Sequence, residues 1–132
     1  MKKIVALLML FCTISVFAAN AADTYIGKLS VSVKGGTPTV NEAQNVSVVE
    51  GSVVTFTIPK FSFPGSPIAA DVVITATKDA QGVLVLKTIK YGFIPIASAE
   101  FTNSTLKDNQ CNINLKMNSG GNVEVIFNGT KQ

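Results

Sequence analysis

The sequence contains no histidine, and this absence excludes more chemistry than any residue that is present. Histidine is the commonest general base and metal ligand of enzymes. The acidic residues are scattered singly, and Asp71, Asp79 and Asp108 lie in predicted turns, where aspartate serves the backbone. We therefore predict that the protein is not an enzyme, with no catalytic residue, no metal ligand and no cofactor. Two carboxylates brought together in space by the fold are the alternative that stays open.

Arginine is absent as well, so every one of the cationic side chains is a lysine. Arginine is the usual bidentate reader of phosphates and of guanine bases. Lys2 and Lys3 lie at the amino terminus, which leaves nine lysines against eight acidic residues from residue 22 onward, a net charge of +1. No stripe of lysines marks one strand or one segment. We expect no nucleic-acid partner.

The amino terminus has the layout of a secretory signal. Lys2 and Lys3 precede an apolar run over residues 4–17, which is followed by Ala19-Asn20-Ala21. A charged start, a short apolar stretch and an A-x-A site predict cleavage after Ala21. The run is too short to favour a permanent membrane span. We expect residues 1–21 to be a signal peptide and residues 22–132 to form one exported domain, in the periplasm, at the cell surface or outside the cell. After cleavage of the signal we expect no integral insertion into a membrane.

The two cysteines, Cys12 and Cys111, provide neither an internal disulfide nor a clear lipid anchor. A lipidated cysteine follows a small residue, whereas bulky Phe11 precedes Cys12 and the apolar run continues beyond it. Plain export is therefore favoured over a lipid anchor at Cys12. After cleavage Cys111 is the one remaining thiol, and it lies in the same alternating phase as Ile113. This phase predicts a small buried hydrophobe rather than a reactive thiol.

Apolar residues recur at every second position in several segments, which is the spacing of strands with one buried face. Val46 and Val48 share one phase, and a second row runs through Val54, Phe56 and Ile58 before it shifts to Phe61 at Pro59-Lys60. Proline cannot donate to a ladder, so this shift predicts a bulge or a strand break. A solvated Lys60 at the bulge is favoured over a Lys60 that contacts a ligand at a rim.

Residues 111–130 predict a hairpin. Its register depends on whether the loop has an odd or an even number of residues. If Met117 lies opposite Val123, then Ile113 lies opposite Phe127 and the apolar rows meet on one face, with residues 119–121 as a glycine-containing loop. A loop one residue shorter would scramble the faces.

A second hairpin is expected where Thr77 lies opposite Val83, so that the row of Ile74 and Ala76 meets Leu84 and Leu86. The segment between Gly92 and Pro95 is expected to be a loop.

Strands that recur every 8 to 15 residues or so, joined by local turns, predict an all-β antiparallel meander of about eight strands. We expect it to close as a small barrel, with a β-sandwich as the alternative. An outer-membrane barrel would need aromatic girdles. The chain has no tryptophan and two tyrosines, which argues against that class.

Three segments, YIGKLSVSV, FTIPKFSF and LKDNQCNINLKMNSGGNVEVIFNG, resemble the calycin-like β-barrel domains that gut bacteria of the Bacteroides group export. The resemblance covers nearly the whole chain after residue 21 and rests on strand and turn patterns. It implies a lipocalin-like meander barrel of about eight strands and offers no functional residues to carry over. Many relatives are lipid-anchored, and this sequence departs from them because it lacks a good lipidation site.

Two functional hypotheses follow for such a barrel. In the first, it encloses a small apolar ligand lined by its phenylalanines, which are Phe56, Phe61, Phe63, Phe101 and Phe127. The competing interpretation of these five residues is a filled core. In the second hypothesis the barrel is a platform for a protein partner, as an inhibitor or surface component, which uses its loops and the outer face of Val73, Thr75, Val83 and Val85.

Overall fold

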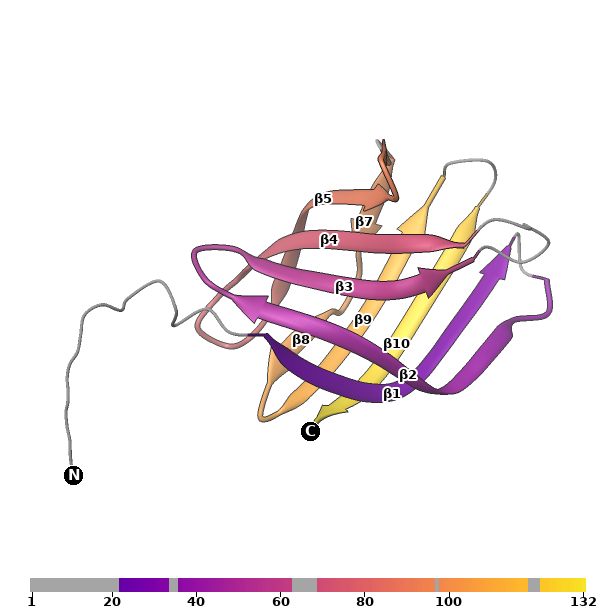
Figure 1. The fold of residues 1–132 in the computed structure, drawn as a ribbon. Helices are drawn as coiled ribbons and strands as arrows, with labels where there is room; N and C mark the ends of the chain where they lie inside the picture. The colour runs from indigo at the N-terminus through magenta and orange to yellow at the C-terminus, as the bar shows by residue number, and fades with distance from the viewer. Residues whose placement is uncertain (1–21, 34–35, 63–68, 97, 119–121) are drawn as a thin grey trace, which may run out of the picture.

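A computed structural model describes residues 22–33, 36–62, 69–96, 98–118 and 122–132. These residues form strands joined by turns, with no helix among them (Figure 1). The predicted signal peptide, Cys12, Phe63 and the loop 119–121 lie outside the described residues. The strands are β1 (Asp23–Val33), β2 (Thr39–Glu50), β3 (Val54–Phe61), β4 (Ala70–Lys78), β5 (Leu84–Tyr91), β6 (Ile94–Pro95), β7 (Ala99–Phe101), β8 (Thr105–Lys107), β9 (Gln110–Met117) and β10 (Val123–Lys131).

All ten strands belong to one antiparallel sheet with the order β6-β5-β4-β3-β2-β1-β10-β9-β7, and β8 also pairs with β9. The predicted all-β meander is confirmed. The excess over eight strands has a simple origin. The short β7 and β8 pair with successive parts of β9, as one interrupted strand would, and β6 is only two residues long. If β7 and β8 are counted as one strand and the short β6 is left out, eight main strands remain.

The sheet curls into a half-barrel, so that β3 and β4 pass in front of β9 and β10 in Figure 1. Its two edges are tied together at one end. The Leu84 N–H donates to the Ser104 carbonyl at 2.9 Å, the Leu106 N–H donates to the Gly82 carbonyl at 2.8 Å, and Val83 bridges to Thr105. Farther along, β5 and β7 contact each other without a ladder. We call this line of contact the seam.

The alternating apolar rows all face the inside of the curl and pack into one core. The final hairpin has the predicted register, with Met117 opposite Val123 and Ile113 opposite Phe127. Cys111 is fully buried in the same row. The core residues are Tyr25, Leu29, Val31, Val46, Val48, Val54, Phe56, Ile58, Phe61, Val72, Ile74, Ala76, Leu84, Ile89, Leu106, Cys111, Ile113, Leu115, Met117, Val123, Val125 and Phe127.

A pair of glycines makes room for the largest side chain of the final strand. Gly27 of β1 lies directly opposite Gly129 of β10. A Cβ added at Gly129 would lie 2.4 Å from the ring of Phe127, and one added at Gly27 would lie 1.9 Å from the Asn128 carbonyl oxygen. Both positions therefore require glycine, because the Phe127 ring and the neighbouring backbone occupy the space of any side chain.

Irregularities change the register of the sheet in the β3–β4 and β4–β5 ladders, and the one in the β4–β5 ladder was not predicted. The β3–β4 register shifts between Ile58 and Phe61, which confirms the bulge at Pro59-Lys60. The expected pairing of Thr77 with Val83 is wrong, since Thr77 lies opposite Val85. A further shift between Thr75 and Ala76 inserts an extra residue into β5, so that Ile89 completes the inner row. The pairing of Ala76 with Leu84 that follows from the same register is also wrong, since Ala76 lies opposite Leu86.

The meander gives the half-barrel two unlike ends. The first and last strands begin and finish at one end, where the tied edges also lie, and we call it the proximal end. The strands β1, β3, β5 and β9 finish at the other, distal end (Figure 1). The segment Gly92–Pro95, expected to be a loop, is a tight turn at the distal end that leads into β6.

Truncation of Phe127 tests the inner row. Its side chain is fully buried, so Phe127→Ala should lower the free energy of unfolding by about 3–5 kcal/mol, a large part of the roughly 5–15 kcal/mol of a small domain. The adjacent Asn128 is exposed on the outer face. Asn128→Ala should change stability by about 0.5 kcal/mol or less. Urea denaturation measures both variants.

Equal losses in these two variants would contradict the assignment of the faces. Asn114 also faces outward, but it is a poorer control. It is half-buried, and its side-chain amide donates to the Asn103 carbonyl at 3.4 Å.

Candidate functional site at the distal end

The structure separates four of the five phenylalanines that were predicted to line a ligand site. Phe56 and Phe127 are fully buried in the packed core. Phe61 lines a cavity at the distal end, and the half-buried Phe101 lines another along the seam. Phe63 lies outside the described residues. The four described side chains therefore do not surround one common space.

The distal cavity exists because β3 stops pairing with β2. Their ladder joins Ser47–Glu50 to Val54–Thr57 and goes no further. Pro59 has no N–H to offer, and Lys60 has a left-handed backbone with φ 51°. The first half of β2 pairs only with β1. An opening is left between this half of β2 and the end of β3.

An apolar floor and a polar wall line this opening, which has a volume of about 150 Å³. Leu29, Val31 and Phe61 form the floor and are buried. The wall comes from β2, where Asn41 lies opposite Leu29 and Gln44 lies opposite Gly27. Directly opposed residues share a face of the sheet, so both amides belong to the inner face. Thr39, Lys60 and Ser62 complete the lining.

Hydrogen bonds hold the side-chain amides of Asn41 and Gln44 in place. The Asn41 Nδ2 donates to the Gln44 Oε1 at 3.1 Å, and the Asn41 Oδ1 accepts the Ala43 N–H at 3.1 Å. The Gln44 Nε2 donates to the Asn45 carbonyl at 2.8 Å. Each amide nitrogen carries two hydrogens, and one hydrogen of each has no protein acceptor among the described residues.

Lys60 brings a cation to the rim of the cavity. Its backbone N–H donates to the Asp71 Oδ1 at 3.2 Å, which fixes the bulge. Its ammonium makes no ion pair within the part of the chain that the structure describes, where the ion pairs are Lys78–Glu50 and Lys131–Asp23. Lys60 is exposed, as the sequence suggested, and it also lines the cavity.

Sequence reasoning missed Asn41 and Gln44. The two residues lie on either side of a second bulge, where the β1–β2 register shifts between Gly27 and Leu29. That shift keeps both polar side chains in the inner phase. The signal in the sequence was the break in apolar alternation over residues 39–45.

A second cavity, of about 200 Å³, follows the seam between β5 and β7. Leu86 and Phe101 contribute apolar, half-buried side chains to it. Glu100 and Val85 close its outer side. It has no counterpart to the cation and paired amides of the distal cavity.

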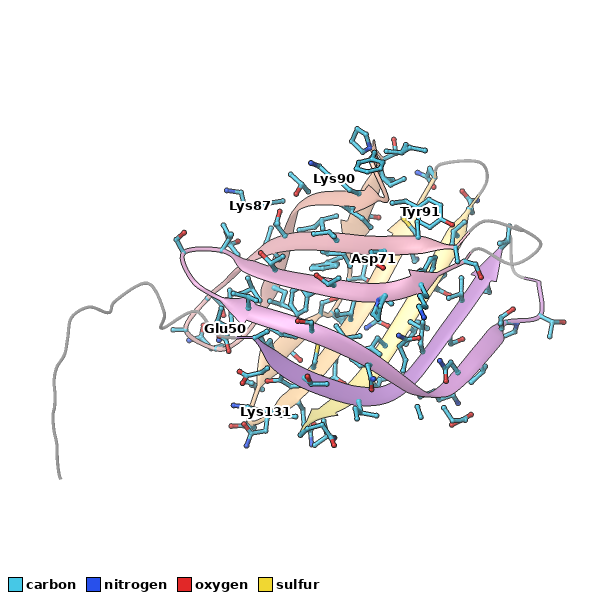
Figure 2. All side chains as sticks on the ribbon, viewed as in Figure 1. Glu50, Asp71, Lys87, Lys90, Tyr91 and Lys131 are labelled. Atoms are coloured by element: carbon cyan, nitrogen blue, oxygen red, sulfur yellow. The ribbon has the colours of Figure 1, made fainter. Side chains whose placement is uncertain are left out.

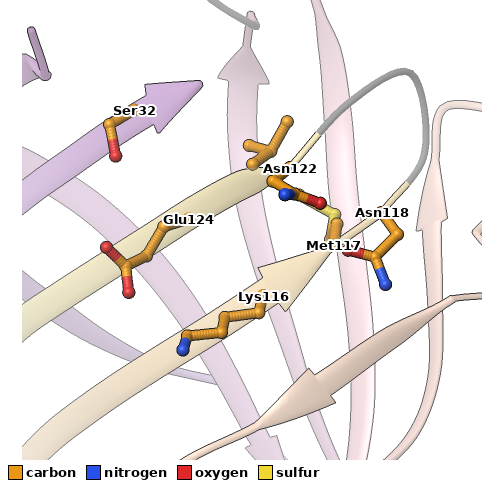
Figure 3. Close-up of a pocket in the computed structure, with 7 residues that line it drawn as sticks. Ser32, Lys116, Met117, Asn118, Asn122 and Glu124 are labelled. Carbon is orange, nitrogen blue, oxygen red and sulfur yellow. The ribbon is translucent and has the colours of Figure 1, made fainter. Parts of the chain in front are cut away.

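A third cavity, of about 320 Å³, lies on the outer face beside the final hairpin (Figure 3). Ser32, Glu124, Lys116 and Glu100 follow one another across four neighbouring strands in one row. Lys116 thus stands between two carboxylates, and opposite charges on facing strands stabilise a sheet. Glu100 and Glu124 share this row but are separated by β9. In the described ranges no group of three or more acidic, cysteine or histidine residues is arranged to hold a metal ion.

Cys111 has the properties of a structural residue. It is fully buried, and burial raises the pKa of its thiol to about 12. Burial also raises the pKa of Tyr25, with a smaller contribution from Cys111. A thiol with such a pKa stays protonated and unreactive at neutral pH.

No known family model, curated protein or solved structure matches this chain. The described residues contain no helix long and apolar enough to cross a membrane.

The buried thiol predicts a specific loss of stability in alkali. The folded pKa of Cys111 is about 12, whereas its ordinary value is 9.0. The stabilisation is complete below the unfolded value and is lost as the pH rises from there toward the folded value, because only the unfolded thiol ionises. Between pH 8 and pH 10 this group alone should cost about 1.4 kcal/mol.

Cys111→Ala removes the titrating group and serves as the reference for all other ionisations. Urea denaturation at both pH values should show the wild-type protein losing more stability than the variant. Parallel losses, or rapid labelling of the native protein by a thiol reagent, would contradict the burial of Cys111.

Proposed function

We propose that the protein is an exported, non-enzymatic barrel of calycin-like type that binds a small ligand with an apolar body and an anionic head at the distal cavity. The observation that carries the proposal is the combination of a buried apolar floor with an ammonium at the rim that has no ion-pair partner among the described residues. Leu29, Val31 and Phe61 supply the floor, and Lys60 supplies the cation. The wall amides Asn41 and Gln44 add fixed donors, so an oxygen-rich head suits them.

The size of the cavity limits the ligand or the part of it that is buried. A volume of about 150 Å³ suits a benzene-sized group, as in an engineered apolar cavity of about the same volume. At roughly 0.5 kcal/mol per heavy atom, a ligand of about eight atoms would bind with a Kd on the order of 1 mM. A longer ligand would extend beyond the rim and gain further contacts there.

The filled interior argues against a large ligand deep in the barrel. Phe56, Phe127 and Ile113 are fully buried and pack in one cluster. Displacing such closely packed side chains would cost more free energy than the binding of a small ligand provides. The ligand therefore belongs at the mouth, with Phe61 as its main aromatic contact among the five phenylalanines.

A second candidate function is the binding of a protein partner on the outer face of β4 and β5. The observation that favours it is exposed apolar surface, with Val83 42% and Val85 61% exposed. Val73 and Thr75 of the same face are only half-buried. The patch lacks aromatic anchors, which usually carry most of the binding energy of an interface, so we rank this candidate second.

Titration with matched small probes tests the ligand proposal. We expect hexanoate to shift the amide NMR signals of Gln44, Lys60 and Phe61, and hexanol to shift the same signals with weaker affinity. Lys60→Gln should weaken hexanoate about 5-fold and leave hexanol nearly unchanged, because only the charged head loses its partner.

Lys28→Gln is the matched control, because Lys28 is an exposed lysine that does not line the cavity. It should bind both probes as the wild-type protein does. Absence of shifts around the cavity with either probe would overturn the proposal. Equal weakening of hexanoate in the two lysine variants would overturn the role of Lys60.

A further inference from the structure

The turn between β5 and β6 carries the most exposed apolar side chains of the described structure. Phe93 is 99% exposed and the adjacent Ile94 is 62% exposed. Isolated exposed hydrophobic residues are common on proteins, but a neighbouring pair this exposed at the end of a projecting turn indicates a contact surface. We call Gly92–Ile94 the tip.

Backbone geometry fixes the tip in a projecting position. Tyr91 pairs with Ile94, and Gly92 has φ 62°, as the first position of a type II′ turn requires. The Gly92 N–H donates to the Asp71 carbonyl at 2.9 Å, and the Ile96 N–H donates to the Ile89 carbonyl at 2.9 Å. The tip is therefore ordered before any partner binds, which reduces the entropy that binding costs.

Lysines lie along the strand that leads to the tip and beside it. Lys90 directly precedes Tyr91, Lys87 lies farther back along β5, and both extend into solvent (Figure 2). Lys60 is linked to the tip through Asp71, which receives hydrogen bonds from both the Lys60 and the Gly92 backbone. None of the three ammonium groups has an ion-pair partner within the described ranges. Asp71 is the acidic residue joined to the tip. Three cations against one carboxylate leave the base of the tip positive.

We propose that the tip binds an anionic lipid surface. Phe93 and Ile94 would enter the boundary between headgroups and acyl chains, and Lys87 and Lys90 would contact lipid phosphates. The convex shape favours a lipid surface over a pocket of a protein partner. A protein hot spot is normally surrounded by further contacts that exclude water, whereas the surroundings of this tip are exposed lysines. A soft, negatively charged surface satisfies the apolar pair and the lysines together.

The proposal concerns a different surface from the ligand cavity and does not depend on it. The two surfaces do share the distal end, where the ring of Phe61 packs edge-on against Tyr91 with the centroids 6.3 Å apart. Tyr91 directly precedes the tip in the chain. A protein docked through its tip would therefore hold the mouth of the cavity close to the lipid.

Cosedimentation with vesicles tests the proposal. Residues 22–132 contain every described strand and every buried residue, so this segment is used without the apolar run at the amino terminus. The vesicles are phosphatidylcholine alone, or phosphatidylcholine mixed with phosphatidylglycerol. We expect clear binding to the anionic vesicles and much weaker binding to the neutral ones.

Variants then separate the apolar contribution from the charge contribution. The double change Phe93→Ser with Ile94→Ser should weaken binding to anionic vesicles at least about 10-fold, through lost burial of apolar surface. Lys87→Gln and Lys90→Gln should each weaken it about 5-fold on anionic vesicles and leave binding to neutral vesicles unchanged. All four side chains are exposed, so circular dichroism and urea midpoints should match the wild-type protein.

Val85→Ser and Lys28→Gln are the controls, because both residues are exposed and neither belongs to the tip or its base. They should bind vesicles as the wild-type protein does. The proposal is overturned if the wild-type protein ignores anionic vesicles, if it binds neutral vesicles equally well, or if the tip variant binds like the controls.

Discussion

The pairing of the first strand with the last is the interaction on which the rest of this structure depends. In the sheet order, β1–β10 is the one ladder that joins the β1–β6 half to the β7–β10 portion, apart from the few contacts along the seam. At the middle of this ladder Leu29 lies opposite Phe127, and next to them Gly27 lies opposite Gly129. The core is continuous only because this ladder brings the two halves together.

That ladder also carries the largest entropic cost of folding. Its partners are separated by nearly the full length of the described chain, so it closes the longest loop in the fold. No disulfide shortens this loop, because Cys111 is the one cysteine in the described part of the chain. The cost is offset by burial, and this explains why Phe127 fits against a glycine pair that accepts no side chain. Glycine weakens a strand, but at Gly129 it leaves room for the Phe127 ring and at Gly27 it leaves room for the facing backbone of β10.

Some of this architecture could be predicted from the sequence, and the limits have a physical cause. The register of the final hairpin was predictable because loop parity and the apolar rows admit only one pairing of Ile113 with Phe127. The register of the β4–β5 hairpin was not, because its ladder ends at Lys78–Leu84, a shift of two residues that leaves the apolar rows in phase. A bulge then changes the parity within β5, and nothing in the sequence around Lys87 marks that bulge. Pro59 does mark its own, since a missing donor is visible in the sequence.

The candidate site shows the same limit. Phe61 was among the residues that the sequence singled out, and it lines the distal cavity, whereas Phe56 and Phe127 belong to the core. A phenylalanine in an inner row looks the same whether it fills the core or reaches a rim. Which phenylalanine reaches the rim depends on where the β2–β3 ladder ends, and the sequence does not show that point. Asn41 and Gln44 were missed for a related reason, because their bulge turns polar side chains inward without any apolar pattern to reveal it.

The two ends of the half-barrel differ in what they expose to solvent. At the proximal end every described connection is tied by hydrogen bonds. The Asp79 carboxylate accepts the Gln81 and Val83 N–H groups at 2.9 Å, and the Lys131 N–H donates to the Asn109 carbonyl at 2.8 Å. The chain ends are held there too, where the Gln132 N–H donates to the Thr24 carbonyl at 2.9 Å.

At the distal end the described turn is also hydrogen-bonded, through the Gly92 and Ile96 N–H groups, but side chains are left exposed. Pro59 ends a ladder, and the left-handed Lys60 brings to the rim an ammonium that has no ion-pair partner among the described residues. The Gly92 turn projects Phe93 into solvent. Each of these features costs stability and none contributes to the core. Exposed apolar and charged side chains of this kind are best explained by binding. The cavity and the tip are therefore the surfaces at which a function of this protein should be sought.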